Sequence, residues 1–214
     1  MYKEAIRPAW VEVNLSNLDY NIKQIKEKAN GRELIGVIKA DAYGHGSVKC
    51  AEVLRKNGVK TFAIATLQEA ITLRESVAKE EIICLGLTPD MYADVIVEHD
   101  LTPVVCDSSN AKAISDAAVA AGKIVSGLIA VDTGMGRVGF QKYEIDELIE
   151  KLKNCKFVKP IGIFSHFSSS DTDAKYTEFQ ENNFEEISKK IISKLPSVKY
   201  KHLLNSFGSL KLKN

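Results

Sequence analysis

The strongest constraint on the fold is an alternation of two kinds of segment along the chain. Short apolar runs rich in β-branched residues recur roughly every 20 to 40 residues, and segments with apolar residues at helical spacing fill the gaps. The runs that fit strands are 34–39, 61–65, 82–85, 102–106, 124–132, 160–166 and 200–205. The segments that fit helices are 46–56, 67–76, 89–98, 108–121, 144–153 and 175–194. This alternation predicts an α/β fold with a parallel sheet.

Two architectures fit such a pattern, an open doubly wound sheet and a closed (β/α)8 barrel. No GxGxxG motif follows the first βα strand, which counts against a dinucleotide-binding open sheet. The barrel is favoured, but only seven of its eight strands are found, so we expect an incomplete TIM-type barrel. The earlier segment 10–15 alternates polar and apolar residues and predicts a half-exposed strand. It leads through a capping-box pattern at Ser16 and Asp19 into a helix that ends near Ala29.

Composition narrows the possible partners. The 214 residues are 45% hydrophobic and 27% charged, as in an ordinary globular protein. A formal charge of +1 gives no field that would attract nucleic acid or an anionic membrane, and no apolar run is long enough for a signal peptide or a transmembrane helix. Four scattered cysteines favour neither disulfides nor a metal site. We expect a cytoplasmic protein that binds a small molecule, without nucleic acid, membrane or metal.

Candidate reactive residues gather at the predicted strand ends. In parallel α/β folds the βα loops at the carboxyl ends of the strands carry the site. These ends present Lys39, Tyr43 and His45 after the first βα strand, Arg137 in the loop after the fifth, His166 after the sixth, and Asn205 and Ser206 after the seventh. We expect these groups to lie at one end of the barrel.

Each of these residues also has a structural interpretation. Lys39 could be a solvated strand end, Asp132 could organise a glycine turn, and His166 could be a hydrogen-bonded core histidine. Asn205 and Ser206 could cap a following helix. The structural interpretation must bring all of them to the same end of the barrel by coincidence, which favours a functional site.

The chemistry of these groups suits one cofactor. A lysine in a partly desolvated barrel mouth near Arg137 would have its pKa lowered by burial and like charge, and would become an imine-forming nucleophile. An arginine and a histidine could hold an anionic oxygen or a ring, and Ser206 with backbone amides could hold a phosphate. Pyridoxal phosphate needs such partners for its aldehyde, ring and phosphate.

Five segments of the chain resemble a known family. RPAWVEVNLSNLDYNI, VIKADAYGHG, VDTGMGRVGF, FSHFSSSD and HLLNS follow, in this order, the pattern of the pyridoxal phosphate-dependent alanine racemases. VIKADAYGHG and DTGMGRVGF are the most specific. The resemblance identifies residues 1–214 as the cofactor-binding barrel domain of a homodimeric isomerase. Such an enzyme interconverts L-alanine and D-alanine and supplies D-alanine for peptidoglycan.

The resemblance also implies roles for individual residues. Lys39 would form the Schiff base with the cofactor and act as the base on the D-alanine side. Arg137 would hydrogen-bond the phenolic oxygen of the ring and help to bind the substrate. The remaining cofactor-binding residues would be Leu85 and His166 near the ring, and Tyr43, Asn205 and Ser206 near the phosphate.

Two departures from the family pattern are visible. Many members carry a lysine, often carbamylated, where this chain has Ala130, which implies a different support for Arg137. The family also continues into an eighth strand with an RxGIxxYG-like segment and a β-rich domain. A tyrosine of that domain is the base on the L-alanine side, in the partner subunit's site. We therefore expect a chain cut or frameshifted after HLLNS, with 206–214 as a tail.

Four readings stay open from the sequence alone. The leading one is an alanine racemase in truncated form. The others are a pyridoxal phosphate-binding barrel without racemase activity, a relative such as a serine racemase or a decarboxylase of basic amino acids, and a fragment without function.

Overall fold

A seven-stranded parallel sheet forms the centre of the protein. The computed structural model describes residues 9–76 and 79–210. Each strand pairs with the next one in sequence, in the order β1 to β7. The strands are β1 (Ile35–Val37), β2 (Thr61–Ile64), β3 (Glu81–Cys84), β4 (Thr102–Val105), β5 (Val125–Ala130), β6 (Val158–Phe164) and β7 (Tyr200–His202). Every predicted βα strand is present, and the expectation of an incomplete TIM-type barrel with seven strands is confirmed.

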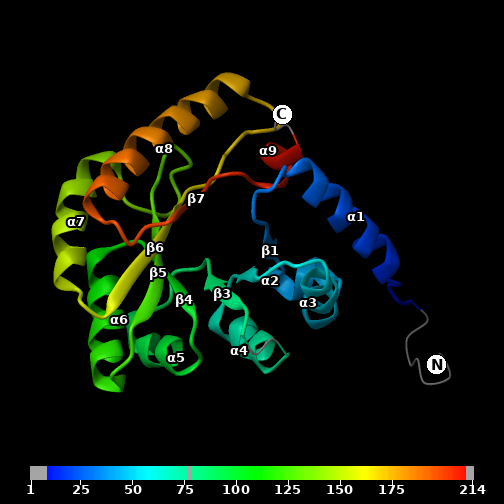
Figure 1. Cartoon of the computed structure of the whole chain (residues 1–214), viewed down its shortest axis with the longest axis horizontal. Helices are drawn as coiled ribbons and strands as arrows, with labels where there is room; N and C mark the ends of the chain where they lie inside the picture. Colours follow the sequence, from blue (N-terminus) through cyan, green and yellow to red (C-terminus); the bar gives the residue numbers. More distant parts are fainter. Residues whose placement is uncertain (1–8, 77–78, 211–214) are drawn as a thin grey trace.

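Helices precede, connect and follow the strands of this sheet. They are α1 (Leu15–Lys28), α2 (Lys39–Gly44), α3 (Ser47–Lys56), α4 (Leu67–Ser76), α5 (Ala93–Glu98), α6 (Ser108–Ala121), α7 (Ile145–Asn154), α8 (Ala174–Lys194) and α9 (Ser206–Leu210), with 3-10 turns η1 (Asp90–Tyr92) and η2 (Lys142–Glu144). Figure 1 shows α3 to α8 arranged outside the curled sheet. Within the ranges that the structure describes, no helix is long and apolar enough to span a membrane.

Alternation along the strands divides the apolar side chains into two layers. Ile129 belongs to the large cluster between the sheet and the helices, whereas Leu128 and Ala130 belong to a smaller cluster on the concave side. Leu128 and Ile129 are both fully buried. Successive strand residues point to opposite faces, so β5 is buried on both sides, as its continuous apolar sequence predicts.

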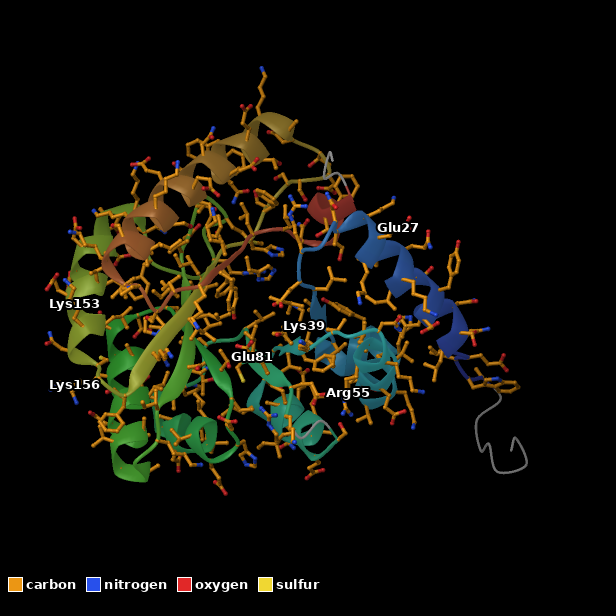
Figure 2. The ribbon with its side chains drawn as sticks, viewed as in Figure 1. Glu27, Lys39, Arg55, Glu81, Lys153 and Lys156 are labelled. Carbon is orange, nitrogen blue, oxygen red and sulfur yellow. The ribbon has the colours of Figure 1, made fainter. Side chains whose placement is uncertain are left out.

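Side-chain contacts link non-neighbouring strands at the end of the sheet where the strands begin. Tyr200, the first residue of β7, donates its hydroxyl to Glu81 Oε1 at 3.5 Å, and Thr102 Oγ1 donates to the same oxygen at 3.1 Å. Burial, and secondly Glu81, raises the pKa of the Tyr200 phenol. Figure 2 marks Glu81 at the start of β3. Non-neighbouring strands therefore meet at this end, and polar side chains at the opposite end can form a site.

The predicted strand at 10–15 is wrong. Residues 10–14 have no regular structure, and Leu15 already begins α1. The helix is capped by Asn14, whose Oδ1 accepts the backbone N–H of Ser16 at 2.9 Å, so the capping box expected at Ser16 and Asp19 is wrong too. No partner strand lies beside this segment among the described residues, and alternation alone cannot form a strand without one.

The described chain ends in a short helix, which the sequence analysis considered only as an alternative. Ser206–Leu210 form α9, and Asn205 Oδ1 accepts the backbone N–H of Gly208 at 2.9 Å, which is the capping role considered as an alternative. Residues 211–214, the rest of the expected tail, lie outside the described ranges.

Candidate active site

The backbone after β1 takes an unusual path. β1 ends at Val37, and Ala40 to Tyr43 have φ of 50° to 54° with ψ of 41° to 49°, which is a left-handed helical turn. Such a conformation costs residues other than glycine roughly 1–2 kcal/mol each. Lys39 lies immediately before this turn and is half-buried, where β1 joins α2 (Figure 2). A strained segment of this kind needs partners to hold it.

A carboxylate from α4 holds the start of the turn. Glu69 Oε1 accepts the backbone N–H of Ala40 at 2.9 Å, and Glu69 Oε2 accepts that of Ala65 at 2.8 Å. At the other end, Asp41 Oδ1 accepts the backbone N–H of Ser47 at 2.6 Å, and this bond lowers the pKa of Asp41. Through Glu69, the backbone of Ala40 is connected to Ala65 at the end of β2. The sequence analysis did not single out Glu69.

A second carboxylate organises the loop that presents Arg137. Asp132 Oδ1 accepts the backbone N–H groups of Gly134 at 2.9 Å and Gly136 at 3.1 Å, and Oδ2 accepts Gln141 Nε2 at 3.1 Å. Burial opposes ionisation of Asp132, but these hydrogen bonds lower its pKa overall. The glycine turn is thus built as the structural interpretation expected, and it presents the exposed Arg137 at the carboxyl end of β5.

The third candidate residue, His166, is influenced electrostatically by both Arg137 and Lys39. It follows β6 and is half-buried, and its pKa is lowered by burial, then by Arg137, then by Lys39. The two cations therefore lie near enough to His166 to act on it, although they come from loops about a hundred residues apart in sequence. A neutral imidazole at neutral pH is the consequence. Lys39, Arg137 and His166 thus follow the carboxyl ends of β1, β5 and β6, which lie on the same side of the parallel sheet.

His202 is the last residue of β7, beside β6. Its ring stacks on Phe164 with a centroid distance of 6.3 Å, and Nδ1 is a buried atom without a hydrogen-bond partner among the described residues. Burial, and secondly His166, lowers the pKa of His202. The prediction of the site from the sequence did not include this histidine. The signal it missed is spacing, since His202 follows Tyr200 by two and so faces the same side of β7.

The other predicted residues lie around this group. Leu85 follows β3 and packs on the concave apolar cluster, while Tyr43 is 62% exposed on the left-handed turn. Asn205 Oδ1 also accepts Ser170 Oγ at 3.0 Å, and Ser206 is exposed at the start of α9. Within the described ranges, no hydrogen bond joins Tyr43, Asn205 or Ser206 to Lys39. A hollow beside the group is lined by Val131, Asp132, Met135, Arg137, Val138, Phe164, Ser165 and His166.

This arrangement offers definite chemistry. Arg137 and His166 line one hollow at the carboxyl ends of β5 and β6, and the amine of Lys39 follows the end of β1. The amine can attack a carbonyl, and the guanidinium can hold an anionic oxygen. Within the described part of the chain, no group of three His, Cys, Asp or Glu residues could hold a metal ion.

Comparison with known proteins identifies the family. Residues 13–214 match the family model described as the N-terminal domain of alanine racemase. The alanine racemase of Clostridium kluyveri is 42% identical over 211 residues, covering 96% of this chain and 53% of the relative. The structure of alanine racemase from Clostridium difficile 630 superposes with a TM-score of 0.90 at 34% identity, covering 97% of this chain and 55% of that one.

A histidine racemase from Leuconostoc mesenteroides subsp. sake is similar as well, with a TM-score of 0.84 at 28% identity, covering 98% of this chain and 56% of that chain. The chain therefore spans about half the length of the relatives it matches. The resemblance found in the sequence motifs is confirmed. Since the family model matches nearly all of residues 1–214, the chain belongs to the family of alanine racemase N-terminal domains.

Proposed function

We propose that this chain is the pyridoxal phosphate-binding domain of an alanine racemase, which interconverts L-alanine and D-alanine for peptidoglycan synthesis. The proposal is carried by the placement of Lys39, Arg137 and His166 at the carboxyl ends of three different strands, where both cations lower the pKa of His166. Membership of the family supports the same activity. A homodimer and a cytoplasmic location belong to this proposal.

The residues present fit the cofactor. Lys39 supplies a half-buried amine for an aldehyde, Leu85 and the concave cluster supply an apolar wall for a ring, and the buried Nδ1 of His202 lacks a partner among the described residues. When bound, pyridoxal phosphate withdraws electrons from the α-carbon of an amino acid and makes its proton removable. Tyr43, Asn205 and Ser206 are proposed to bind the phosphate.

The residues of this chain then have distinct tasks. Lys39 Nζ would hold the cofactor and would take up or return a proton on one face of the α-carbon. The Arg137 guanidinium would hold an anionic oxygen of the cofactor and orient the substrate. Burial and the two neighbouring cations oppose protonation of His166, so it would add no further positive charge to the site. Racemisation also requires a second base on the opposite face of the α-carbon.

Borohydride trapping tests the proposal. The full-length native protein is loaded with pyridoxal phosphate, reduced with borohydride and mapped by peptide mass. Label is expected on Lys39, and Lys39→Ala should abolish both labelling and racemisation. Lys49→Ala is the matched control, because Lys49 is exposed and pairs only with Glu52 among the described residues. Label on another lysine, with cofactor bound normally by Lys39→Ala, would contradict the assignment.

Substrate choice needs a separate measurement. The similarity to a histidine racemase shows that this barrel occurs in racemases of other amino acids. Racemisation of L-alanine, L-serine and L-histidine by the full-length protein is compared by kcat/KM. Alanine is expected to give the highest value. A higher value for serine or histidine would keep the racemase class and change the substrate.

A further inference from the structure

The buried side chain of Gln180 connects the loop after β5 to the loop after β6. Gln180 lies on α8 and has no exposed surface. Its Nε2 donates to the backbone carbonyl of His166 at 3.1 Å and to Thr133 Oγ1 at 3.3 Å. Its Oε1 accepts the backbone N–H of Ser168 at 2.9 Å and Ser168 Oγ at 3.1 Å. All four of these hydrogen bonds go to the loops after β5 and β6.

Two of these partners fix the orientation of the amide. The backbone N–H of Ser168 can only donate and the carbonyl of His166 can only accept, so oxygen and nitrogen of Gln180 cannot exchange places. Thr133 Oγ1 in turn lies 2.9 Å from Ser165 Oγ. The amide therefore ties the first residues of the Arg137 loop to the backbone of His166 itself.

A second side chain on the same helix face contacts the Arg137 loop. Tyr176 lies one turn before Gln180, and its hydroxyl donates to the backbone carbonyl of Gly134 at 2.6 Å. A side chain at Gly134 would meet that hydroxyl, since a Cβ there would lie 2.7 Å from it. Tyr176 thus holds the β5 loop alone, whereas Gln180 holds both loops.

We propose that Gln180 is a positioning residue that sets the placement of Arg137 relative to His166 by joining the two loops to α8. The amide touches neither residue's side chain; it acts through Thr133 and through the backbone at His166 and Ser168. Its relevance to catalysis rests on the function proposed above. A buried polar group is costly unless its hydrogen bonds are made, and the four bonds to the loops offset that cost for Gln180 on the buried face of α8.

Hydrogen–deuterium exchange of the cofactor-free native protein tests the inference without activity. Gln180→Leu removes the four bonds at similar volume, and Tyr176→Phe removes only the bond to Gly134. Phe184→Leu is the matched control, since Phe184 is buried on the same helix. Gln180→Leu should speed exchange in both 132–140 and 165–170, by about tenfold for amides that depend on the lost bonds. Tyr176→Phe should affect 132–140 alone, and Phe184→Leu neither.

A second readout connects the inference to the cofactor. In protein loaded with pyridoxal phosphate, Gln180→Leu should shift the pH titration of cofactor absorbance and lower kcat, whereas Phe184→Leu should not. Unchanged exchange in both loops, or equal exchange in Gln180→Leu and Phe184→Leu, would overturn the inference. If Gln180→Leu does not fold, the milder Gln180→Asn, whose shorter side chain cannot keep all four bonds, decides by the same comparison of exchange in 132–140 and 165–170. Wild-type protein that forms no adduct at Lys39 would refute the proposed function, while the exchange result would still decide the loop coupling.

Discussion

Glu69 is expected to determine whether the left-handed turn after Lys39 persists. Its carboxylate accepts backbone N–H groups of Ala40, Ala65 and Thr66, the last at 3.2 Å, and Thr66 Oγ1 accepts the Glu69 N–H at 3.3 Å. Thr66 and Glu69 thus form a capping box for α4, and the second oxygen extends it to the turn. Glu69→Ala removes the carboxylate from all three amides.

The size of the effect follows from these contacts. Loss of a helix cap costs about 1 kcal/mol, and a hydrogen bond to a charged group contributes about 1.5–3 kcal/mol, with the lower end fitting the half-buried Glu69. Since the exposed amides of Ala40 and Thr66 can bind water instead, we expect Glu69→Ala to lower the free energy of unfolding by about 2–4 kcal/mol. Glu69→Gln keeps one acceptor oxygen and should lose about half as much.

Urea unfolding of the cofactor-free native protein measures this difference. Glu75→Ala on the same helix is the control, because Glu75 is exposed and a surface change alters stability by at most about 0.5 kcal/mol. Hydrogen exchange at Ala40 should rise in Glu69→Ala only. Equal stability of Glu69→Ala and Glu75→Ala, with unchanged exchange at Ala40, would refute the role of Glu69.

Three further predictions concern the site. Arg137→Ala should lower racemisation but change the free energy of unfolding by less than about 1 kcal/mol, because Arg137 is exposed; a larger loss in urea unfolding would show a structural role. Burial depresses the pKa of His166 and His202 below 6.5, so stability should rise with pH in the range below 6.5, and His166→Asn should flatten that slope unless the assignment is wrong. A polypeptide of residues 1–214 alone should form no D-alanine from L-alanine, because Lys39 serves one face only; turnover would reveal a second base within it.

The strands and most helices could be predicted because their patterns are local. Apolar runs and helical spacing place β2, α4 and α6 within one residue of their bounds. The same reading places Lys39, Arg137 and His166 at strand ends, since a parallel sheet brings all carboxyl ends to one side. The prediction of a strand at 10–15 failed because alternation along one segment carries no information about a neighbouring strand.

The backbone of the turn after Lys39 could not be predicted from its residues. Ala40 to Tyr43 contain no glycine, and only Gly44 and Gly46 nearby favour positive φ. Four left-handed residues cost roughly 4–8 kcal/mol together. Contacts elsewhere in the fold must offset that cost, and Glu69 lies 29 residues from Ala40 in sequence.

Glu69 and Gln180 show what determines the geometry of this site. Each is a polar residue on a helix that packs against the outer side of the sheet, and each binds backbone atoms of loops at the carboxyl ends of the strands. The side chains of Lys39, Arg137 and His166 are themselves exposed or half-buried. Their relative placement therefore depends on the helices behind them. Variants of Glu69 and Gln180 should separate placement from chemistry, because Lys39, Arg137 and His166 stay unchanged.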